Sequence, residues 1–222
     1  MPATLSPEAF LTELDALVQT ALSRIGEASA AHPPADGISI AKLLEIALKN
    51  ELEASEEAAL WMTTERDVHV KLALARQCGD EAKHYRLIEE RLRALGVDTA
   101  SIDPTKSGAT PMFTFLAGLE TTVERIAAGQ LTREALAGVR NRVFADHCEA
   151  QGDHETARLY RDVIQPDEAH HHALGRKLRA RFAIDETTQA KARAAAMRTV
   201  ELAEELQELA RLKRGVGRAP GC

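Results

Sequence analysis

Two short stretches of the sequence combine acidic residues with histidine at a spacing that suits metal binding. They read GDEAKHY, residues 79–85, and PDEAHHH, residues 166–172. Residues three apart on a helix differ by about 60° in direction, so Glu81 with His84, and Glu168 with His171, each project from one face. Each pair therefore offers one carboxylate and one imidazole to the same ion.

The repetition carries more weight than the spacing, because glutamate is abundant in this chain and a single E-x-x-H pair arises readily by chance. Both copies read D-E-A-x-H, and each falls on the second helix of an expected helical hairpin. Carboxylate-bridged di-iron sites use two such pairs from two helices. The alternative is that the two phrases are ordinary polar helix segments.

The elements that must position these residues are helices. Hydrophobic residues make up 45% of the 222, charged residues 28% and aromatic residues only 4%. Ala, Leu, Glu and Arg dominate, and β-branched runs with period two are missing, which favours long helices and an all-α fold. The length suits a single domain spanning 1–222.

Helix signals along the chain predict two hairpins with an additional helix at each end. The expected N-terminal helix covers about 7–31, the first hairpin about 38–63 and 68–95, the second about 112–150 and 154–182, and the C-terminal helix about 186–214. The stretch AAGQLT, residues 127–132, is a candidate interruption, and the tail GVGRAPGC is expected to fray, which leaves Cys222 without a role. A connection of about 15 residues after Gly96 can cross a bundle lengthwise. Two hairpins joined by one crossover predict a ferritin-like four-helix bundle with its core at about 38–182.

A two-metal site needs further carboxylates, one from the first helix of each hairpin, because imidazole leaves the charge of the cations uncompensated. In an antiparallel hairpin, two side chains lie side by side when they are the same number of residues from the turn. In the first hairpin Arg66 marks the turn, and the residue as far before it as Glu81 lies after it is Glu51. Three other acids on this helix remain alternatives: Glu53, Glu56 and Glu57.

The same count in the second hairpin starts from the turn at Gly152. The residues as far before Gly152 as Glu168 lies after it, or slightly farther, are those at 134–136, and the only carboxylate among them is Glu134. If the third helix stops at Gly129, this count fails. Two acids earlier in the chain then remain alternatives: Glu120 and Glu124.

Composition and cysteine usage disfavour several other classes of function. A formal charge of -6 gives no electrostatic reason to expect nucleic acid. Cys78, Cys148 and Cys222 are scattered and form no CxxC, which predicts a reduced, cytoplasmic compartment. The N-terminus is acidic where a signal peptide would be basic, and no apolar run has the length of a membrane span.

Three segments resemble the ferritin-like di-iron carboxylate superfamily, above all its rubrerythrin-like members and the ferritin-like tRNA hydroxylases. They read NELEA from Asn50, DEAKHYRLIEERLRALG from Asp80 and GDHETARLYRDVIQPDEAHHHALG from Gly152, and the resemblance covers about 40–180. It implies two iron ions, with manganese or a mixed iron and manganese pair as alternatives. The ligands it implies are Glu51, Glu81, His84, Glu134, Glu168 and His171. Asp80 and Asp167 would then orient the two histidines, since a ligating histidine commonly needs such a partner.

The chain departs from the patterns of this superfamily at three points. Ferritins carry a tyrosine seven residues after the first ligand, where this chain has Ala58. Full rubrerythrins append a four-cysteine iron domain, which three scattered cysteines cannot build. Soluble oxygenases often place a threonine four residues after the third-helix glutamate, where this chain has Gly138. These departures weaken the case for a built-in redox tyrosine, for an internal electron relay and for oxygenase chemistry.

The three consecutive histidines differ in their expected roles. His171 matches His84 in the repeated phrase and is the expected ligand, while His170 points about 100° away from it. His172 stays on the face of Glu168, but its counterpart in the first copy is Tyr85. This equivalence predicts that His172 and Tyr85 form hydrogen bonds beside the ligands.

Three functions follow from these residues. The first is an O2-dependent di-iron oxidase or oxygenase, with an unknown small substrate and an unknown electron donor. The second is an iron- or peroxide-handling protein without an organic substrate. The third is a helical interaction protein that binds no metal. A homodimer is compatible with all three.

Overall fold

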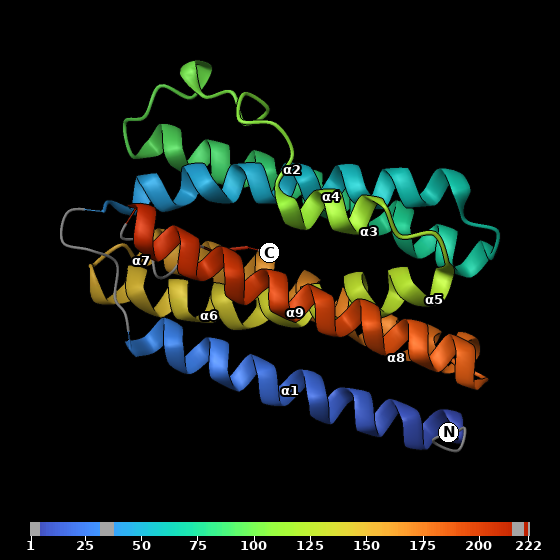
Figure 1. Cartoon of the computed structure of the whole chain (residues 1–222). Helices are drawn as coiled ribbons and strands as arrows, with labels where there is room; N and C mark the ends of the chain where they lie inside the picture. The colour runs from blue at the N-terminus through green and yellow to red at the C-terminus, as the bar shows by residue number, and fades with distance from the viewer. Residues whose placement is uncertain (1–4, 32–37, 215–219, 222) are drawn as a thin grey trace.

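The computed structural model describes residues 5–31, 38–214 and 220–221. Every regular element in these ranges is helical, so the predicted all-α class is confirmed. Figure 1 shows the long helices running roughly parallel or antiparallel to one another.

The first hairpin consists of α2 (Ile40–Thr64) and α3 (Val68–Ala94), which pack side by side (Figure 1). The side chain of Ser39 accepts a hydrogen bond from the amide of Lys42 at the start of α2. Asp67 does the same for the amides of His69 and Val70 at the start of α3. The cap at Asp67 lies in the turn from which Glu51 and Glu81 are equally distant, whereas Ser39 caps the opposite end of α2.

The crossover from the first hairpin contains η1 (Thr99–Ser101) and leads to α4 (Pro111–Ala117) and α5 (Thr122–Arg125). At 127–132, the candidate interruption, the chain stays helical but changes from α- to π-helix, and the break in the helix lies earlier, between α4 and α5. Thr121 and Glu124 form a capping box there, which starts a new helix.

Residues 126–133 form a π-helical segment, η2 (Ile126–Arg133), that runs directly into α6 (Glu134–Ala150). The hydroxyl of Thr132 donates to the carbonyl of Ala127 five residues back, 2.8 Å away. Two glycines let η2 pack closely against its neighbours: Gly129 within η2, which faces α2, and Gly175 on α8, which faces η2. A Cβ on Gly129 would lie 2.7 Å from the Trp61 ring, and a Cβ on Gly175 would lie 2.6 Å from that of Gln130.

The second hairpin pairs α6 with a continuous helical stretch made of α7 (His154–Leu159), η3 (Tyr160–Ile164) and α8 (Gln165–Phe182). η3 is again π-helical. Asp153 caps α7 by accepting from the amide of Thr156. The predicted second hairpin is therefore present, with a π-helical turn inside its second helix.

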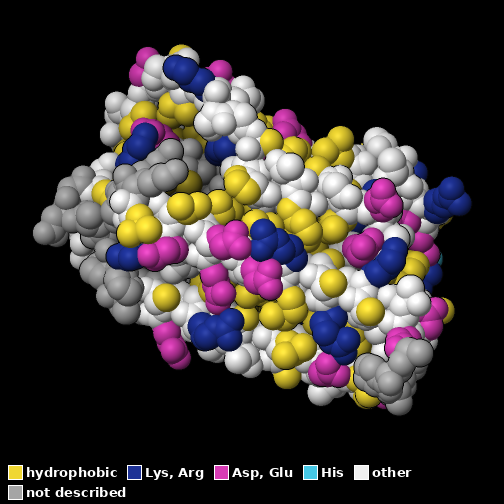
Figure 2. Space-filling model, viewed as in Figure 1, with side chains coloured by type: hydrophobic (Ala, Val, Ile, Leu, Met, Phe, Trp, Pro, Cys, Tyr) yellow, Lys and Arg dark blue, Asp and Glu magenta, His cyan; other side chains and the backbone are white. Residues whose placement is uncertain are grey.

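The N-terminal helix α1 (Pro7–Ala31) packs against α6 and α8 of this second hairpin, and the C-terminal helix α9 (Glu186–Arg214) packs against η2, α5 and α1. Figure 2 shows acidic and basic side chains interspersed over the face of the molecule that it views. On α9, for example, Arg198 pairs with Glu201 and Glu205 at 3.1 and 2.9 Å.

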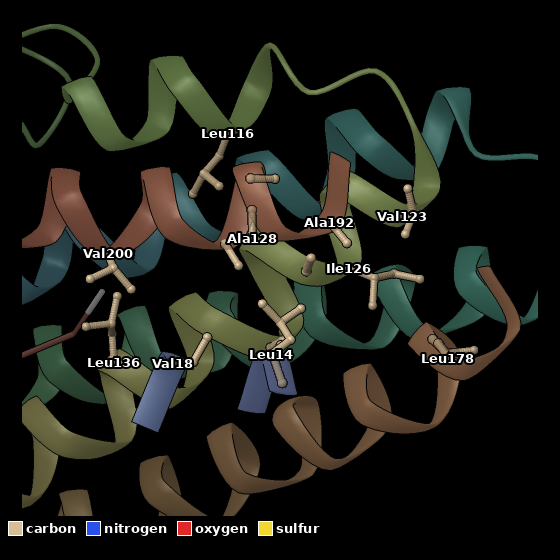
Figure 3. Packing of buried hydrophobic residues seen from close by; sticks show 14 of the residues in the cluster. Leu14, Val18, Leu116, Val123, Ile126, Ala128, Leu136, Leu178, Ala192 and Val200 are labelled. Atoms are coloured by element: carbon tan, nitrogen blue, oxygen red, sulfur yellow. The ribbon is translucent and has the colours of Figure 1, made fainter. Parts of the chain in front are cut away.

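Two apolar clusters fill the interior. The first apolar cluster joins α1, α9 and η2 to the end of α2 and the start of α3, and part of it is drawn in Figure 3. It includes Leu14, Leu116, Ile126, Leu136 and Val200. The second apolar cluster lies toward the other ends of the hairpin helices and includes Leu44, Ile88, Leu92, Phe144 and Tyr160. Along α2, α3 and α8, an interval that contains buried acids and histidines separates the two clusters.

The prediction of a frayed tail is wrong for Pro220 and Gly221, which are buried. The amide of Gly221 donates to the side chain of Asn141, and the carbonyl of Pro220 accepts from Asn50. These backbone contacts replace the apolar side chains that the tail lacks. Cys222 lies outside the described residues.

Candidate metal centre

Six side chains converge in the polar interval between the two apolar clusters, and they are the six that the sequence selected. Glu51 comes from α2, Glu81 and His84 from α3, Glu134 from the first residue of α6, and Glu168 and His171 from α8. Each of the six residues is at most 3% exposed. Four carboxylates and two imidazoles thus share one water-poor interior.

These side chains form two overlapping groups whose ligand atoms lie within 4.8 Å of one another. One group contains Glu51, Glu81, His84 and Glu168, and the other contains Glu81, Glu134, Glu168 and His171. Glu81 and Glu168 belong to both groups. Each group has the size and donor types of a metal-binding site, and the two shared carboxylates can bridge them.

The Nδ1 atom of each histidine faces the carboxylates. His84 Nδ1 lies 3.1 Å from Glu81 Oε2 and 3.4 Å from Glu51 Oε2. His171 Nδ1 lies 3.6 Å from Glu81 Oε1 and 3.6 Å from Glu134 Oε2. The two oxygens of Glu81 therefore face different histidines, as expected of a bridging carboxylate.

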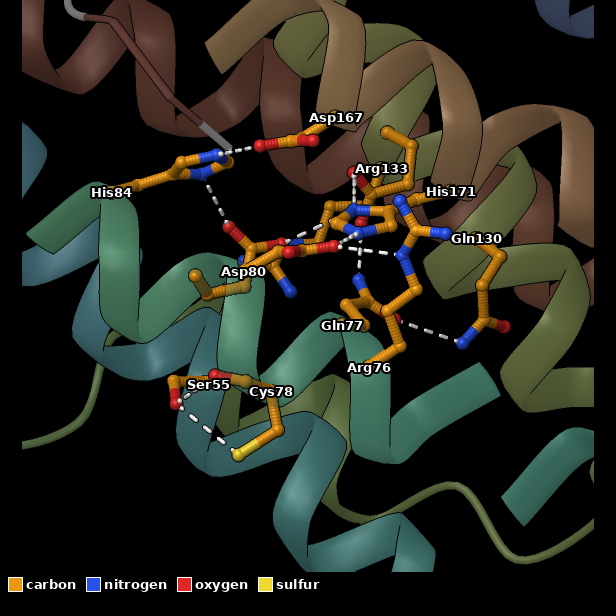
Figure 4. Close-up of polar contacts among 12 residues, drawn as sticks. Ser55, Arg76, Gln77, Cys78, Asp80, His84, Gln130, Arg133, Asp167 and His171 are labelled. Carbon is orange, nitrogen blue, oxygen red and sulfur yellow. Dashed lines mark hydrogen bonds and ion pairs between the residues drawn. The ribbon is translucent and has the colours of Figure 1, made fainter. Parts of the chain in front are cut away.

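The Nε2 atoms face away from the cluster and contact the aspartates of the repeated phrases, as Figure 4 shows. His84 Nε2 lies 3.1 Å from Asp167, and His171 Nε2 lies 3.1 Å from Asp80. The predicted role of these aspartates in orienting the histidines agrees with these contacts. The partners are crossed, however, since each copy of the phrase supplies the aspartate for the other copy's histidine.

A basic residue accompanies each aspartate. Lys83 Nζ lies 2.5 Å from Asp167, and Arg76 Nε lies 3.2 Å from Asp80. An aspartate that is held as an anion draws the ring proton to Nε2 and leaves the Nδ1 lone pair for a cation. With a metal bound, the crossed pairs would thus favour the tautomer of each ring that keeps its proton on Nε2 and offers Nδ1 to the ion.

His172 and Tyr85 have other contacts than the sequence predicted. His172 Nδ1 donates to the carbonyl of Leu131, 2.9 Å away, and so ties α8 to η2. Tyr85 is half-buried against the second apolar cluster. His170 is exposed, as its direction on the helix predicted.

The alternative acids on α2 have other partners. Glu53 pairs with Lys49 at 3.0 Å and accepts from the amide of Thr110 at 2.9 Å, which anchors the end of the crossover. Glu56 is exposed. Glu57 is buried and pairs with Arg133 at 2.8 Å. The structure therefore places Glu51, and none of these three, in the two groups of candidate ligands.

The alternative acids after the crossover are also placed elsewhere. Glu120 is exposed, and Glu124 accepts from the amide of Thr121 in the capping box. Because η2 continues the helical path through Gly129, Glu134 keeps the height that the count from the turn predicted.

The pKa values of the histidines show the pull of the surrounding acids. Burial alone lowers the pKa of His84, but Glu51 and Glu81 outweigh burial and raise it to about 11. Burial likewise lowers the pKa of His171, which Glu134, Glu81 and Asp80 raise to about 9. Without a cation, both rings are therefore protonated at neutral pH.

The carboxylates respond in opposite directions. Burial raises the pKa of Glu51 to about 7, although the contact with His84 opposes it. Burial also raises the pKa of Glu134, but Glu168 and His171 outweigh it and lower the value to about 2. The metal-free cluster thus balances its acids with protons, which bound cations would displace.

Two glutamines extend the cluster and were not found from the sequence. Gln77 Nε2 donates to Glu134 Oε1 at 2.5 Å, and Gln130 Nε2 donates to Gln77 Oε1 at 3.1 Å (Figure 4). Gln77 lies four residues before Glu81 on the same face of α3, which is the spacing that could have indicated it. Gln130 lies on η2, whose π-helical geometry the sequence did not predict.

A tyrosine also lies near the cluster, on a different helix from the position where ferritins have one. Tyr160 on η3 is fully buried, and its hydroxyl has no hydrogen-bond partner among the described residues. Its pKa is raised well above the ordinary value by burial and by the charges of Glu51, Cys148 and Glu168. Ala58, by contrast, is a buried core residue of the first apolar cluster.

Several cluster atoms lack a hydrogen bond within the described part of the chain. They are Glu51 Oε1, Glu134 Oε2 and His171 Nδ1, all buried. Buried polar atoms are normally satisfied, so groups left open in a confined acidic cluster call for an ion. Oxygen and imidazole donors without thiolate suit iron, manganese or zinc.

Comparison with known proteins found no matching family model, no matching curated protein and no matching solved structure. Among the described helices, none is long and apolar enough to cross a membrane. The function must therefore be inferred from the site itself.

Proposed function

We propose that this chain is a ferritin-like protein in which the four glutamates and two histidines hold two metal ions, iron first and manganese as the alternative. The observation that carries the proposal is the pair of overlapping groups that share Glu81 and Glu168. Two divalent cations would balance the charge of the four carboxylates. The two helical hairpins and the crossover give the arrangement in which ferritin-like proteins build such a centre.

Each side chain has a defined part in this proposal. Glu51 with His84 would bind one ion and Glu134 with His171 the other, while Glu81 and Glu168 bridge them. Asp80 and Asp167 hold the imidazoles through Nε2. Gln77 fixes one oxygen of Glu134. The two apolar clusters on either side exclude bulk water.

A bound di-iron pair supplies one-electron redox chemistry toward O2 or peroxide. The first function we propose is an O2-dependent oxidase or oxygenase with a separate electron donor. The alternative is a protein that handles iron or peroxide without an organic substrate. Gly138 supports this alternative, because it stands where soluble oxygenases of the superfamily often place a threonine.

Metal analysis of the protein purified without chelator tests the proposal. We expect two iron or manganese ions per chain, and their loss in Glu81→Ala, which removes a carboxylate common to both groups. Glu120→Ala is the matched control, because Glu120 is exposed and outside the cluster. Metal-free wild-type protein, or equal metal content in both variants, would refute the proposal. Substrate-dependent O2 uptake by the iron-loaded protein then separates the two functions.

A further inference from the structure

Pro220 and Gly221 form a short strap between α2 and α6. Asn50 Nδ2 on α2 donates to the carbonyl of Pro220 at 2.9 Å. The amide of Gly221 donates to Asn141 Oδ1 on α6 at 2.7 Å. Both residues of the strap are buried. The strap therefore bridges the first helices of the two hairpins through its backbone.

On α2 the strap lies directly beside a proposed ligand of the metal centre, and on α6 it lies two helical turns beyond one. On α2, Asn50 directly precedes Glu51. On α6, Asn141 lies seven residues after Glu134, two helical turns away on the same face. Asn141 also falls between Leu136 of the first apolar cluster and Phe144 of the second. The strap thus runs from the neighbour of Glu51 on α2 to the boundary between the two apolar clusters on α6.

The contact surface is built for a chain segment without a side chain. Gly221 has φ +83°, and a Cβ there would lie 3.1 Å from Asn50 Cβ and 3.2 Å from Asn50 Nδ2. Asn141 is 0% exposed, which is costly for an amide unless it is hydrogen-bonded. The amide of Gly221 satisfies its carbonyl oxygen. Two asparagines and one glycine thus make a specific seat for the strap.

The other sides of the cluster are closed by helix packing. α2 packs along α3, α6 along α8, and α3 against α8. Between α2 and α6, the strap forms the bridge through one hydrogen bond to each helix. Release of the strap breaks two hydrogen bonds, whereas opening any other side separates packed helices.

We propose that the strap is a cover for the α2–α6 side of the metal centre, and that ions and small oxidants reach the cluster on this side when it is released. This inference rests on the proposed function for its ligands. Its geometric part, that the strap limits solvent access to the cluster, does not depend on metal.

The test compares the wild type with Gly221→Val and with a variant that ends at residue 219. Valine is excluded from the seat by its Cβ and by the positive φ. Gly108→Val is the matched control, since Gly108 also has a positive φ, +69°, but nothing lies within 4 Å of a Cβ built there. It reproduces the backbone strain without touching the strap.

In the metal-loaded protein we expect Gly221→Val and the shortened variant to lose metal to a chelator roughly 30-fold faster, the factor that two hydrogen bonds of ordinary net strength support. The metal content at equilibrium should equal that of the wild type in all three variants. The rate of metal loss in Gly108→Val should also equal that of the wild type. Equal rates in Gly221→Val and the wild type would overturn the inference.

Hydrogen exchange in the metal-free chain keeps this test separate from the proposed function. We expect the Gly221 amide to be protected in the wild type, and the side-chain amide of Gln77, which contacts Glu134, to exchange faster in Gly221→Val. An unprotected Gly221 amide, or unchanged exchange at Gln77, would overturn the strap even if metal binds. If the wild type binds no metal but exchange behaves as expected, the proposed function fails and the cover remains.

Discussion

The crossed contacts between aspartate and histidine allow a prediction about one metal position at a time. Asp167→Asn removes the anionic partner of His84 but leaves every proposed ligand in place. The amide can still contact Nε2, but it no longer stabilises a ring that carries its proton there and presents Nδ1 to a cation. Lys83, which pairs with Asp167, also loses its counter-charge beside the site.

The size of the effect follows from the burial of this contact. His84 is fully buried, the Asp167 side chain is only 18% exposed, and the two atoms lie 3.1 Å apart. Removing such an outer partner typically weakens metal binding by about 10- to 100-fold. This corresponds to about 1.4 to 2.8 kcal/mol. The unbalanced charge of Lys83 favours the upper part of this range.

The assay is a titration of the metal-free protein with Mn²⁺, with free Mn²⁺ followed by electron paramagnetic resonance. Asp167→Asn should weaken the position that His84 serves and spare the one that His171 serves, and Asp80→Asn should do the reverse. Asp146→Asn is the control, because Asp146 is 65% exposed and pairs only with Arg161 among the contacts seen. Equal weakening of both positions by Asp167→Asn, or affinities like those of the control, would show that the crossed pairs do not hold the histidines for metal.

Two further predictions concern packing and pH. Gly175→Ala should destabilise the fold by about 1–3 kcal/mol in urea unfolding, because its Cβ would lie 2.6 Å from Gln130 Cβ. Gly138→Ala should leave the stability unchanged or raise it by at most about 1 kcal/mol, because no atom lies within 4 Å of a Cβ built at Gly138. Equal losses of stability in Gly175→Ala and Gly138→Ala would contradict the close packing of η2. The pKa values of His84 and His171 are raised to about 11 and 9, so a metal ion must displace protons from both rings. We therefore expect metal binding to release protons and to tighten as pH rises from 6 to about 9. Calorimetry in buffers of different ionisation enthalpy measures the number of protons released. By the same shifts, the metal-free chain has the full stabilisation by these rings below their unfolded pKa of about 6.5. It loses this stabilisation as pH rises through about 9 for His171 and about 11 for His84, and a flat unfolding profile across this range would argue against it.

The convergence of the six side chains could be predicted because it depends on short-range regularities. The helical period places Glu81 and His84 on one face, and equal distance from a capped turn matches Glu51 to Glu81. These relations hold for any straight antiparallel hairpin. The count to Glu134 also succeeded, although the stretch from Gly152 to Glu168 contains the π-helical η3.

The features that sequence reasoning missed depend on how the two hairpins pack. Whether Asp167 contacts its own copy's histidine or that of the other copy depends on the relative height of α3 and α8, which no local pattern encodes. The π-helix η2 depends on Gly129 and Gly175, which let Trp61 and Gln130 approach closely. The strap depends on backbone groups, which every sequence possesses, so composition predicted only that the tail has little to bury.

The charges around the cluster indicate why a cation is its natural complement. Asp80, Asp167 and Glu57 each have a basic partner at 2.5 to 3.2 Å, so the surrounding shell is neutralised pair by pair. The four glutamates inside that shell are different, because the metal-free chain balances them with protons on histidine and on Glu51. Burial of several carboxylates that need protons to coexist is costly for folding. Two divalent cations would replace these protons, satisfy the open oxygens of Glu51 and Glu134, and convert a destabilising cluster into a link between the two hairpins.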